Sequence, residues 1–333
     1  MENKDLKLSI IVPIYNVERY VRGCVSSLYR QGFAEEEFEV ILVNDGSLDG
    51  SMEVLAPIQE QHNNIKVINQ PNQGQASARN NAMECAQGEY VFFIDSDDML
   101  VDNSLKPLLC QLMESGADTI QGGYVKIDDK DFPNQGLSSE QVAHEVIIRS
   151  GKEHFMADSA YDCYVWQNIY KKEFLLSAGL KFVPGVFFED VAYYGEMLIK
   201  AERYAVSSIK HYVYRQREGS TMTTMNKEKL IHMNIVNEHL WNRCKDIVGA
   251  DKKYHDALVN RIFCSTVSVN FWYVTHYRNI YPYWKEILND LKRRIPLDVF
   301  DVTYKQRCTV ACLKYFPGIS LWIRYKLNQK KYG

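Results

Sequence analysis

The sequence of 333 residues has no long apolar run and no excess of positive charge. Crossing a bilayer takes about 20 consecutive apolar residues, and no stretch approaches that length. The polar segment Met1–Asp5 leads directly into a strand pattern and does not resemble a signal peptide, so we expect a cytoplasmic protein. The net charge of −3 argues against a nucleic-acid partner, which would need a basic surface.

The sequence also lacks any pair of cysteines at the short spacing of a zinc or redox site. Cys308 and Cys312, four residues apart, would share one face of a helix. We therefore expect reduced thiols buried in the interior of the protein. The eight cysteines are Cys24, Cys85, Cys110, Cys163, Cys244, Cys264, Cys308 and Cys312.

A glycine-rich phosphate loop is missing as well. No Gly-x-Gly-x-x-Gly follows the first predicted strand, which argues against a Rossmann dehydrogenase. The same region has no glycine-rich loop bearing a lysine, the element with which a nucleotidyltransferase generally holds a triphosphate. This absence weakens the interpretation of the chain as a nucleotidyltransferase, which stays open as an alternative function.

The first third of the chain alternates strand and helix patterns, and its composition (46% apolar, 24% charged) is that of a globular protein. This alternation predicts parallel strands joined by right-handed crossovers, an α/β fold. The predicted strands are 8–15, 38–43, 65–68, 90–94 and 119–127, and the predicted helices are 17–28, 52–61 and 76–86. Residues 128–160 predict an irregular loop, and the chain from about 225 onward predicts helices rich in aromatic residues.

Polar groups follow three of the predicted strands: Tyr15-Asn16, residues 44–47 and residues 95–98. In parallel sheets, ligands bind in the crevice beyond the carboxyl ends of the strands. The three groups therefore predict one binding site.

Asp95-Ser96-Asp97-Asp98 is the sharpest of these groups. Carboxylates at the end of a buried strand repel one another unless a cation or hydrogen-bond donors compensate them. Mg²⁺ accepts one or two protein carboxylates and completes its shell with phosphate oxygens and water. The alternative is a capping cluster for a helix near Leu105.

Four features, with six residues in all, have two interpretations each. Asp45 is either a turn aspartate or the acceptor for a base N–H such as N3 of uracil, and Tyr15 either stacks on the base or is half-buried. Glu189-Asp190 is either a helix cap or contains a general base. Arg215 and Arg217, on a predicted loop, either hold a diphosphate or are solvated.

Taken together, these motifs resemble the family 2 glycosyltransferases, inverting enzymes of the GT-A fold, of the bacterial surface-polysaccharide type. The resemblance covers about Leu8 to Ser220, and its elements occur in the family's order. They are residues 12–16, 43–47, 72–74, 78–80, 88–98, 165–171 and 189–190. Two departures are Asn44, where many members have Asp, and Gln167-Asn168, where many have Asn-Lys. The second departure lies towards the acceptor side and leaves acceptor choice open.

The resemblance implies a role for each matching position. A nucleotide pocket would be lined by Pro13, Tyr15, Asn16 and Glu18, with Asp45 on uracil, Ser47 nearby, and Asn72 and Arg79 on the nucleotide or its phosphates. Asp95 and Ser96 would lie beside the ribose and donor sugar, and Asp97 would bind Mn²⁺ or Mg²⁺. Asp190 would be the catalytic base with Glu189 beside it, and Arg215 or Arg217 would close over the diphosphate.

The implied reaction moves a hexose or N-acetylhexosamine from a UDP-sugar to a hydroxyl of a saccharide or lipid-linked saccharide. The implied division is a GT-A domain over 1–222, with a nucleotide half to about 127 and an acceptor half over 128–222, followed by a helical region over 223–333. The sugar, linkage and acceptor stay open. A non-catalytic nucleotide-sugar or polysaccharide-assembly binding protein is the alternative from another class.

The last part of the sequence is basic. No Asp or Glu follows Asp301, whereas Lys305, Arg307, Lys314, Arg324, Lys326, Lys330 and Lys331 do. Ile319, Trp322, Ile323 and Leu327 would share one helical face. The pattern fits either an interfacial helix on an anionic membrane or a helix docked on the protein. The aromatic-rich helices would either bury a homodimer interface or cover their own core.

Overall fold

The computed structural model describes residues 6–133, 136–138, 145–157, 162–217, 225–300, 302–315 and 317–332, with side chains except at 305, 327 and 329–332. The chain divides into two compact units. Unit 1 comprises Met1–Gly185 and Lys200–Glu218, and unit 2 comprises Val186–Ile199 and Gly219–Gly333. The domain boundary expected at residue 222 stays a prediction.

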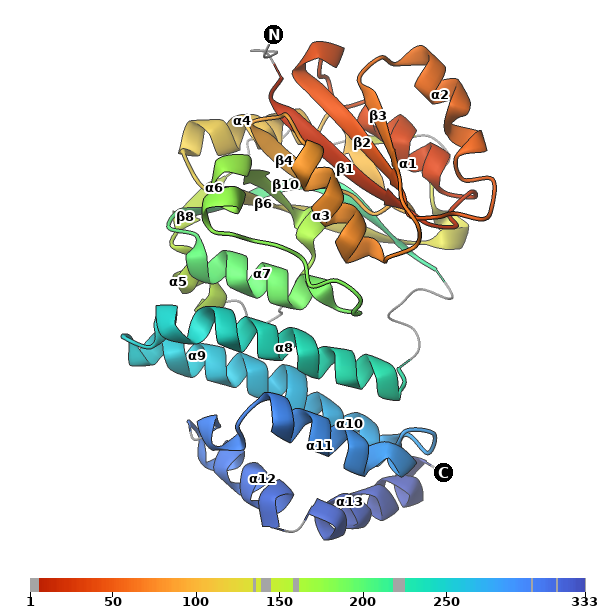
Figure 1. The fold of residues 1–333 in the computed structure, drawn as a ribbon. Coiled ribbons are helices and arrows are strands. Elements are labelled where there is room, and N and C mark those ends of the chain that lie inside the picture. The colour runs from red at the N-terminus through yellow and green to blue at the C-terminus, as the bar shows by residue number, and fades with distance from the viewer. Residues whose placement is uncertain are drawn as a thin grey trace. The chain divides into compact units, whose positions relative to one another are not determined.

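Unit 1 is built on one sheet, which has ten strands within the described residues (Figure 1). The strand order is β3-β2-β1-β4-β9-β6-β10-β5-β7, with β8 paired to β10. The strands are β1 (Leu8–Ile14), β2 (Phe38–Asn44), β3 (Ile65–Asn69), β4 (Tyr90–Phe93), β5 (Met99–Asp102), β6 (Thr119–Asp128), β7 (Leu137–Ser138), β8 (Val146–Arg149), β9 (Asn168–Lys171) and β10 (Tyr204–Gln216). All five predicted strands are confirmed to within one residue at either end.

The sheet is parallel where the sequence predicted it and mixed elsewhere. β3, β2, β1 and β4 run parallel to one another, whereas β9 runs antiparallel to both β4 and β6. β5 and β8 are antiparallel to β10. The nucleotide half therefore has the doubly wound arrangement that brings the carboxyl ends of its strands to one edge.

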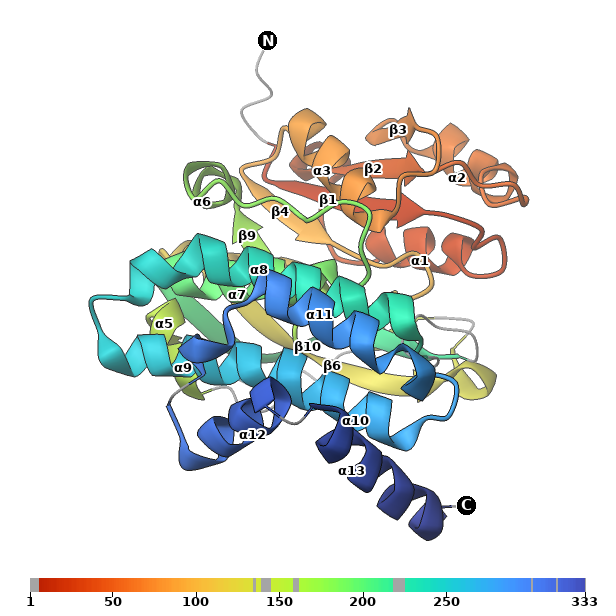
Figure 2. The ribbon, with the colours of Figure 1, turned by 60° about the horizontal axis from the view of Figure 1, so that its bottom comes forward.

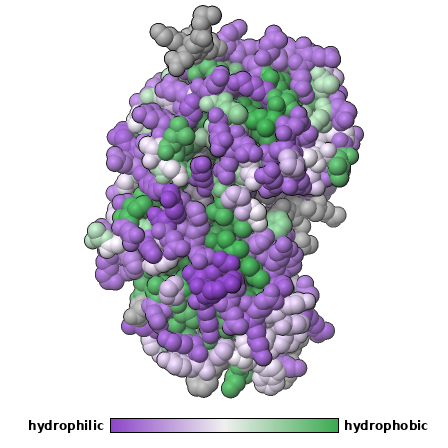
Figure 3. Space-filling view, viewed as in Figure 1, coloured by the Kyte–Doolittle hydropathy of each residue, from purple (hydrophilic) through white to green (hydrophobic). Residues whose placement is uncertain are grey.

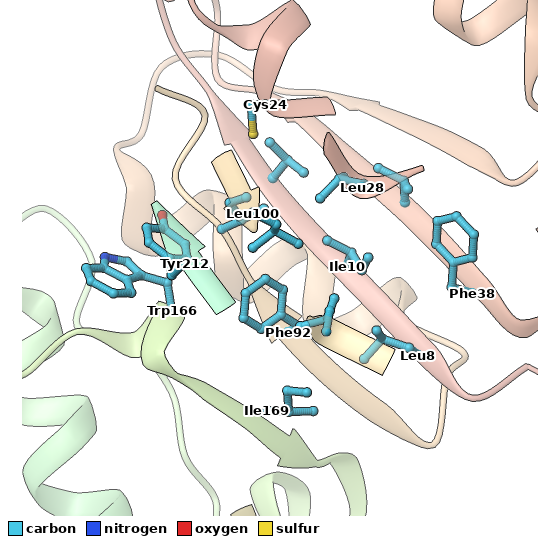
Figure 4. Close-up of a cluster of buried hydrophobic side chains, with 14 of the residues drawn as sticks. Leu8, Ile10, Cys24, Leu28, Phe38, Phe92, Leu100, Trp166, Ile169 and Tyr212 are labelled. Carbon is cyan, nitrogen blue, oxygen red and sulfur yellow. The ribbon is translucent and has the colours of Figure 1, made fainter. Parts of the chain in front are cut away.

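Helices cover both faces of this sheet (Figure 1). The even-numbered residues of β1 pack in one buried cluster with α1 and α4. Figure 4 shows Leu8 and Ile10 of β1 in this layer with Phe92 of β4 and Leu28 of α1. The helices are α1 (Val21–Leu28), α2 (Ala56–Gln61), α3 (Gln75–Cys85), α4 (Leu105–Ser115), α5 (Gly151–Ala157) and α6 (Lys172–Ser177). Burial of both faces explains why the central strands are continuous apolar runs rather than alternating ones.

Two expectations about local structure are wrong. Residues 128–160 were expected to be irregular, but their described part contains β7, β8 and α5. Tyr214–Gln216 were expected in a loop, but they continue β10, because β6 supplies partners as far as Asp128. The rest of that expected loop, residues 218–220, lies outside the described residues.

Unit 2 is helical in its described part, as the sequence predicted from residue 225 onward. One buried cluster contains Leu230, Val274, Ile280, Ile287 and Leu321. A π-helical turn over Cys264–Ser268 joins two of the helices. The helices are α7 (Glu189–Lys200), α8 (Lys227–Val248), α9 (Lys252–Phe263), α10 (Val269–His276), α11 (Trp284–Arg294), α12 (Tyr304–Tyr315) and α13 (Pro317–Tyr332).

All eight cysteines are free thiols, as expected. Their expected burial is wrong for five of them, since only Cys24, Cys163 and Cys244 are buried. Hydrophilic residues cover most of the face seen in Figure 3. Among the described helices, none is both long and apolar enough to cross a membrane.

Candidate active site

The three polar groups predicted at strand ends lie along one edge of the sheet in unit 1. β1, β2 and β4 are parallel and end at Ile14, Asn44 and Phe93. The loops that follow them are joined by side chains: Gln75 donates to Asp95 at 2.7 Å, and Asp45 accepts from the loop that precedes α3. The parallel topology therefore brings residues from three separate sequence motifs to one place.

The loop after β1 is braced against the loop after β2. The Asn16 N–H donates to Ser47 Oγ at 3.2 Å, and the Leu48 N–H donates to Asn16 Oδ1 at 2.8 Å. Glu18 Oε2 accepts from the Gly50 N–H at 3.1 Å. Pro13 is buried inside β1, whereas Tyr15 is 45% exposed. Tyr15 therefore presents the aromatic ring that a nucleotide base can reach at this edge.

Asp45 is buried and fixes the loop between β3 and α3. Its Oδ1 accepts from Gln70 Nε2 at 2.7 Å and from the Gln73 N–H at 2.8 Å, and its Oδ2 accepts from the Gly74 N–H at 2.8 Å. Asn72, in the same loop, is exposed. A carboxylate offers about four acceptor positions, so these three bonds leave one at Oδ2. Asp45 is thus more than a turn aspartate, because it binds the loop between β3 and α3 and keeps one acceptor position.

Gly46, in the loop after β2, lies against the loop between β3 and α3 and has a φ of +74°. A Cβ at this position would come within 2.9 Å of the Asn72 backbone nitrogen. Only glycine permits both this backbone conformation and this approach without strain. The Asp45-Gly46 pair is thereby explained by the close contact of the two loops.

The acids at the end of β4 have different partners. Asp95 Oδ1 accepts from Arg79 Nη2 at 2.8 Å, and Arg79 is itself buried and stacked on Phe182. Ser96 is buried, and Asp97 is 24% exposed and ion-paired to Arg217. The interpretation of this group as a helix cap is wrong, because β5 follows it and α4 begins only after Ser104.

Asp98 is the buried member of the group and was given no role by the sequence. Its carboxylate accepts from the Tyr212 hydroxyl and from the Arg215 N–H, each at 2.7 Å. Burial raises the pKa of Asp98 well above its usual range, and the charges of Asp97 and Asp95 raise it further. The Tyr212 hydroxyl also accepts from the Asp95 N–H at 3.2 Å, so it holds both ends of the acidic turn.

The two predicted arginines face this turn from β10 and the residue after it. Arg215 donates to the Asp97 carbonyl and to Asp129 at 2.7 Å each, and its guanidinium lies 3.3 Å from the centre of the Phe132 ring. Arg217 donates to the Asp97 carboxylate instead. Burial alone would lower the pKa of Arg217, but Asp97 raises it, so the side chain stays cationic. Among the described residues, Arg217 therefore has Asp97, the candidate metal ligand, as its anionic partner.

The acids fit a divalent cation that is shared with a diphosphate. Among the described residues, no group of three or more His, Cys, Asp or Glu side chains forms a complete metal site. A magnesium-type ion needs only one or two protein carboxylates when phosphate oxygens and water fill the other positions. Asp97 supplies a partly exposed carboxylate, and the cation would offset the repulsion between Asp95, Asp97 and Asp98.

An aromatic group lies next to the acidic turn and was not predicted. The rings of Tyr164, Trp166 and Tyr212 stack in sequence, with centroids 4.6 and 3.9 Å apart. Tyr124 meets Trp166 edge-on, and Tyr214 lies beside it. Burial and Tyr164 raise the pKa of Tyr214 to about 12, and Asp98, Asp95 and Asp97 add to this shift. The half-buried Tyr214 therefore feels the charges of the acidic turn, and Tyr212 contacts Asp98 directly.

Glu189 and Asp190 belong to unit 2 and occupy the first turn of α7. Glu189 is buried and Asp190 is half-buried. The residue before them, Phe188, has a φ of +66°, which is rare for a bulky side chain and costs about 1–3 kcal/mol. The Phe187 N–H donates to His232 Nδ1 of α8 at 3.1 Å and anchors this segment. The acids lie within the helix rather than before it, where a cap would be.

Comparison with known proteins identifies the fold and the family. The family model described as Glycosyl transferase family 2 matches residues 9–176. Glycosyltransferase GlyG of Streptococcus pneumoniae serotype 4 is 32% identical over 225 residues, 65% of this chain and 73% of GlyG. EpsJ of Bacillus subtilis, an uncharacterized glycosyltransferase, is 31% identical over 216 residues, 64% of this chain and 62% of its own length. The chain thus spans less than two thirds of EpsJ.

The crystal structure of Staphylococcus aureus TarS 1–349 with UDP-GlcNAc matches with a TM-score of 0.73 at 22% identity, over 98% of this chain and 92% of that chain. The sheet and its covering helices have the GT-A fold. The chain belongs to glycosyl transferase family 2. A nucleotidyltransferase and a non-catalytic binding protein, the alternatives left open by the sequence, are thereby set aside.

Proposed function

We propose that this glycosyltransferase moves a hexose or N-acetylhexosamine from a UDP-sugar to a hydroxyl of a saccharide or lipid-linked saccharide, with inversion at the anomeric carbon. The observation that carries the proposal is the turn after β4, where Asp97 pairs with Arg217 beside Asp95 and Asp98. A carboxylate with a movable cationic partner is suited to a metal-bound diphosphate. TarS, which shares the fold, binds UDP-GlcNAc, and this supports a uridine nucleotide as the carrier.

The nucleotide would occupy the edge formed by the loops after β1 and β2. Tyr15 offers an exposed ring to the base, and Asp45 has one acceptor position left for a base N–H. Asn16, Glu18 and Ser47 brace these loops, with Pro13 behind them in β1. Asn72 is exposed beside them and can reach the nucleotide.

The donor sugar and diphosphate would lie over the acidic turn. Asp95, with buried Ser96 beside it, would face the ribose and donor sugar, and Arg79 would act through Asp95 rather than on phosphate directly. Asp97 would hold Mn²⁺ or Mg²⁺, and Arg217 would turn from Asp97 to the diphosphate. Arg215 is held by Asp129 and Phe132 and would fix the turn.

The reaction is a single in-line displacement. Asp190 removes the proton from the acceptor hydroxyl, the acceptor oxygen bonds to the anomeric carbon, and the bond from that carbon to the diphosphate breaks. Glu189, beside Asp190 in the first turn of α7, would assist by holding the segment. A divalent cation, when bound, neutralises charge on the departing diphosphate. One displacement without a covalent sugar intermediate inverts the configuration.

A saccharide acceptor is supported by the aromatic group beside the acids. Tyr124, Tyr164 and Tyr214 present half-buried rings, and Tyr124 Oη donates to Asp162 at 2.7 Å. Each combines an apolar face with a polar edge, as a pyranose ring requires of its neighbours. A cytoplasmic location and a homodimer stay predictions of the sequence.

The test is release of uridine diphosphate from a panel of UDP-sugars, with and without Mn²⁺. Wild type should release it slowly from one or two sugars in a metal-dependent manner, and Asp97→Asn should not. Asp131→Asn is the matched control, because Asp131 is an exposed acid of the same unit. If release requires an acceptor, none will be seen even with an active enzyme. Equilibrium binding of UDP is therefore measured on the same samples. Absence of both release and uridine nucleotide binding would overturn the proposal.

A further inference from the structure

Helix α13 docks on the rest of unit 2 by one of its faces. Leu321 is buried, and Tyr325 stacks on Tyr281 with the ring centroids 3.9 Å apart. Asn328 Nδ2 donates to the Thr275 carbonyl of α10 at 3.3 Å. These residues recur at positions i, i+4 and i+7, which defines a single helical stripe. The interpretation of this segment as a docked helix is therefore correct for that stripe.

The opposite stripe of α13 is apolar and exposed. Ile319 is 61% exposed, Trp322 53% and Ile323 45%, and Lys326 is also exposed. They recur at i, i+3, i+4 and i+7, so they share one face, which we call the outer face of α13. In Figure 2, α13 is the last helix and ends at the C-terminus of the chain. Large apolar side chains grouped on an exposed helix face mark an interaction site more often than isolated ones do.

The C-terminal segment that contains the outer face is basic. Residues 302–333 contain seven Lys or Arg and no Asp or Glu. Lys314 pairs with Asp298 at 3.0 Å, and Arg324 lies over the Phe271 ring at 4.8 Å, but both remain exposed, as does Arg307. The side chains of Lys305, Leu327, Lys330 and Lys331 lie outside the described residues. A tryptophan and two isoleucines flanked by cations are typical of a helix that lies in the headgroup region of a bilayer.

We propose that the outer face of α13 binds an anionic lipid surface. Its apolar side chains would enter the boundary between headgroups and acyl chains, and each cation close to the surface would be attracted by the anionic lipids. A second copy of this chain fits the face less well, because it would bring two stretches of like charge together. The proposal goes beyond the transfer reaction and does not depend on which sugar is moved.

The experiment is co-sedimentation of the full chain with vesicles of phosphatidylcholine alone and of phosphatidylcholine with phosphatidylglycerol. Wild type should sediment with the anionic vesicles, remain largely unbound with the neutral ones, and lose binding as salt is raised. Trp322→Ser combined with Ile323→Ser should lower the partition coefficient at least about tenfold, since burial of both apolar side chains is lost. Both residues are exposed, so the fold should persist, and circular dichroism checks this.

Leu176→Ser is the matched control, because Leu176 is 63% exposed in unit 1 and lies outside the basic region. Lys326→Glu is the second variant and should weaken binding to anionic vesicles, although the apolar side chains of the outer face stay unchanged. Equal sedimentation of wild type and the double variant would overturn the proposal. So would a dimer of wild type, seen by light scattering without lipid, that the double variant abolishes, because the face would then belong to a second copy.

Discussion

Arg217 Nε donates to Oδ2 of Asp97 at 2.8 Å, and Arg217 Nη2 lies 2.8 Å from the same oxygen in an ion pair. The same carboxylate is the proposed ligand of the divalent cation. A cation bound by Asp97 would compete with the arginine for this carboxylate until a diphosphate gave the arginine another anionic partner. This competition would couple metal binding to donor binding.

Replacing Arg217 by Gln should strengthen Mn²⁺ binding in the absence of nucleotide. A partly buried ion pair of this kind is worth about 1 kcal/mol, so the gain should be roughly fivefold. The affinity for uridine diphosphate should fall in the same variant, because a cation is lost. Titration of free Mn²⁺ by electron paramagnetic resonance, with and without uridine diphosphate, measures both effects. Arg22→Gln serves as control, and unchanged Mn²⁺ affinity in Arg217→Gln would refute the competition.

Replacing Tyr212 by Phe should loosen the acidic turn. The variant removes one of the two 2.7 Å donors to the buried Asp98 carboxylate, which costs about 1–3 kcal/mol of unfolding free energy. Tyr170→Phe is a matched control, because it is equally buried and loses a 2.8 Å bond to the Val165 carbonyl. Urea denaturation should show destabilisation in both variants, whereas metal-dependent nucleotide binding should weaken in Tyr212→Phe alone.

Replacing Asp45 by Asn should release the loop between β3 and α3. An amide cannot accept from Gln70, Gln73 and Gly74 as a carboxylate does, so at least one backbone N–H loses its partner. Faster hydrogen exchange over residues 70–76 and weaker uridine binding are expected together. Asp118→Asn is the control, since Asp118 accepts from the backbone N–H groups of residues 202 and 203 away from this edge. Normal uridine binding in Asp45→Asn would remove Asp45 from the base pocket.

Replacing Asp190 by Asn should lower the rate of sugar transfer about a hundredfold or more while leaving donor binding intact. An amide cannot take the proton of the acceptor hydroxyl, but it preserves the size of the side chain. Uridine diphosphate release and equilibrium donor binding measure the two properties separately. Glu189→Gln should reduce transfer less. Full turnover in Asp190→Asn would show that another group is the base.

His211 should make stability depend on pH. Its ring is fully buried and its pKa is lowered from 6.5 to about 4 because burial disfavours the charged form. The unfolded chain therefore binds more protons than the folded chain between pH 6.5 and 4, and stability falls as pH is lowered through this window. The loss should reach about 3 kcal/mol at pH 4. Urea unfolding of wild type and His211→Gln at several pH values isolates the effect, and parallel pH profiles would contradict it.

Much of this protein follows from its sequence because the patterns concerned are local. The apolar run from Leu8 to Ile14 needs cover on both faces, and this alone predicts a parallel strand with helices on either side. Parallel strands then bring Asp45 and Asp95 to one edge, whatever the details of packing. The family follows from the order of such motifs, which is also a property of the chain itself.

Tertiary structure decided which partner each of these side chains has. Tyr212 holds Asp98 from 114 positions away, and Arg217 holds Asp97 from 120 positions away, so no local pattern reveals either contact. Long-range pairing along β10 likewise turned an expected loop into a strand. Charge and hydrophobicity are properties of residues, but compensation of a buried charge depends on what the fold brings beside it. The sequence by itself therefore determined the fold class and placed Asp45, Asp95 and Asp97 at the ends of strands, and only the folded chain determined how these acids are held.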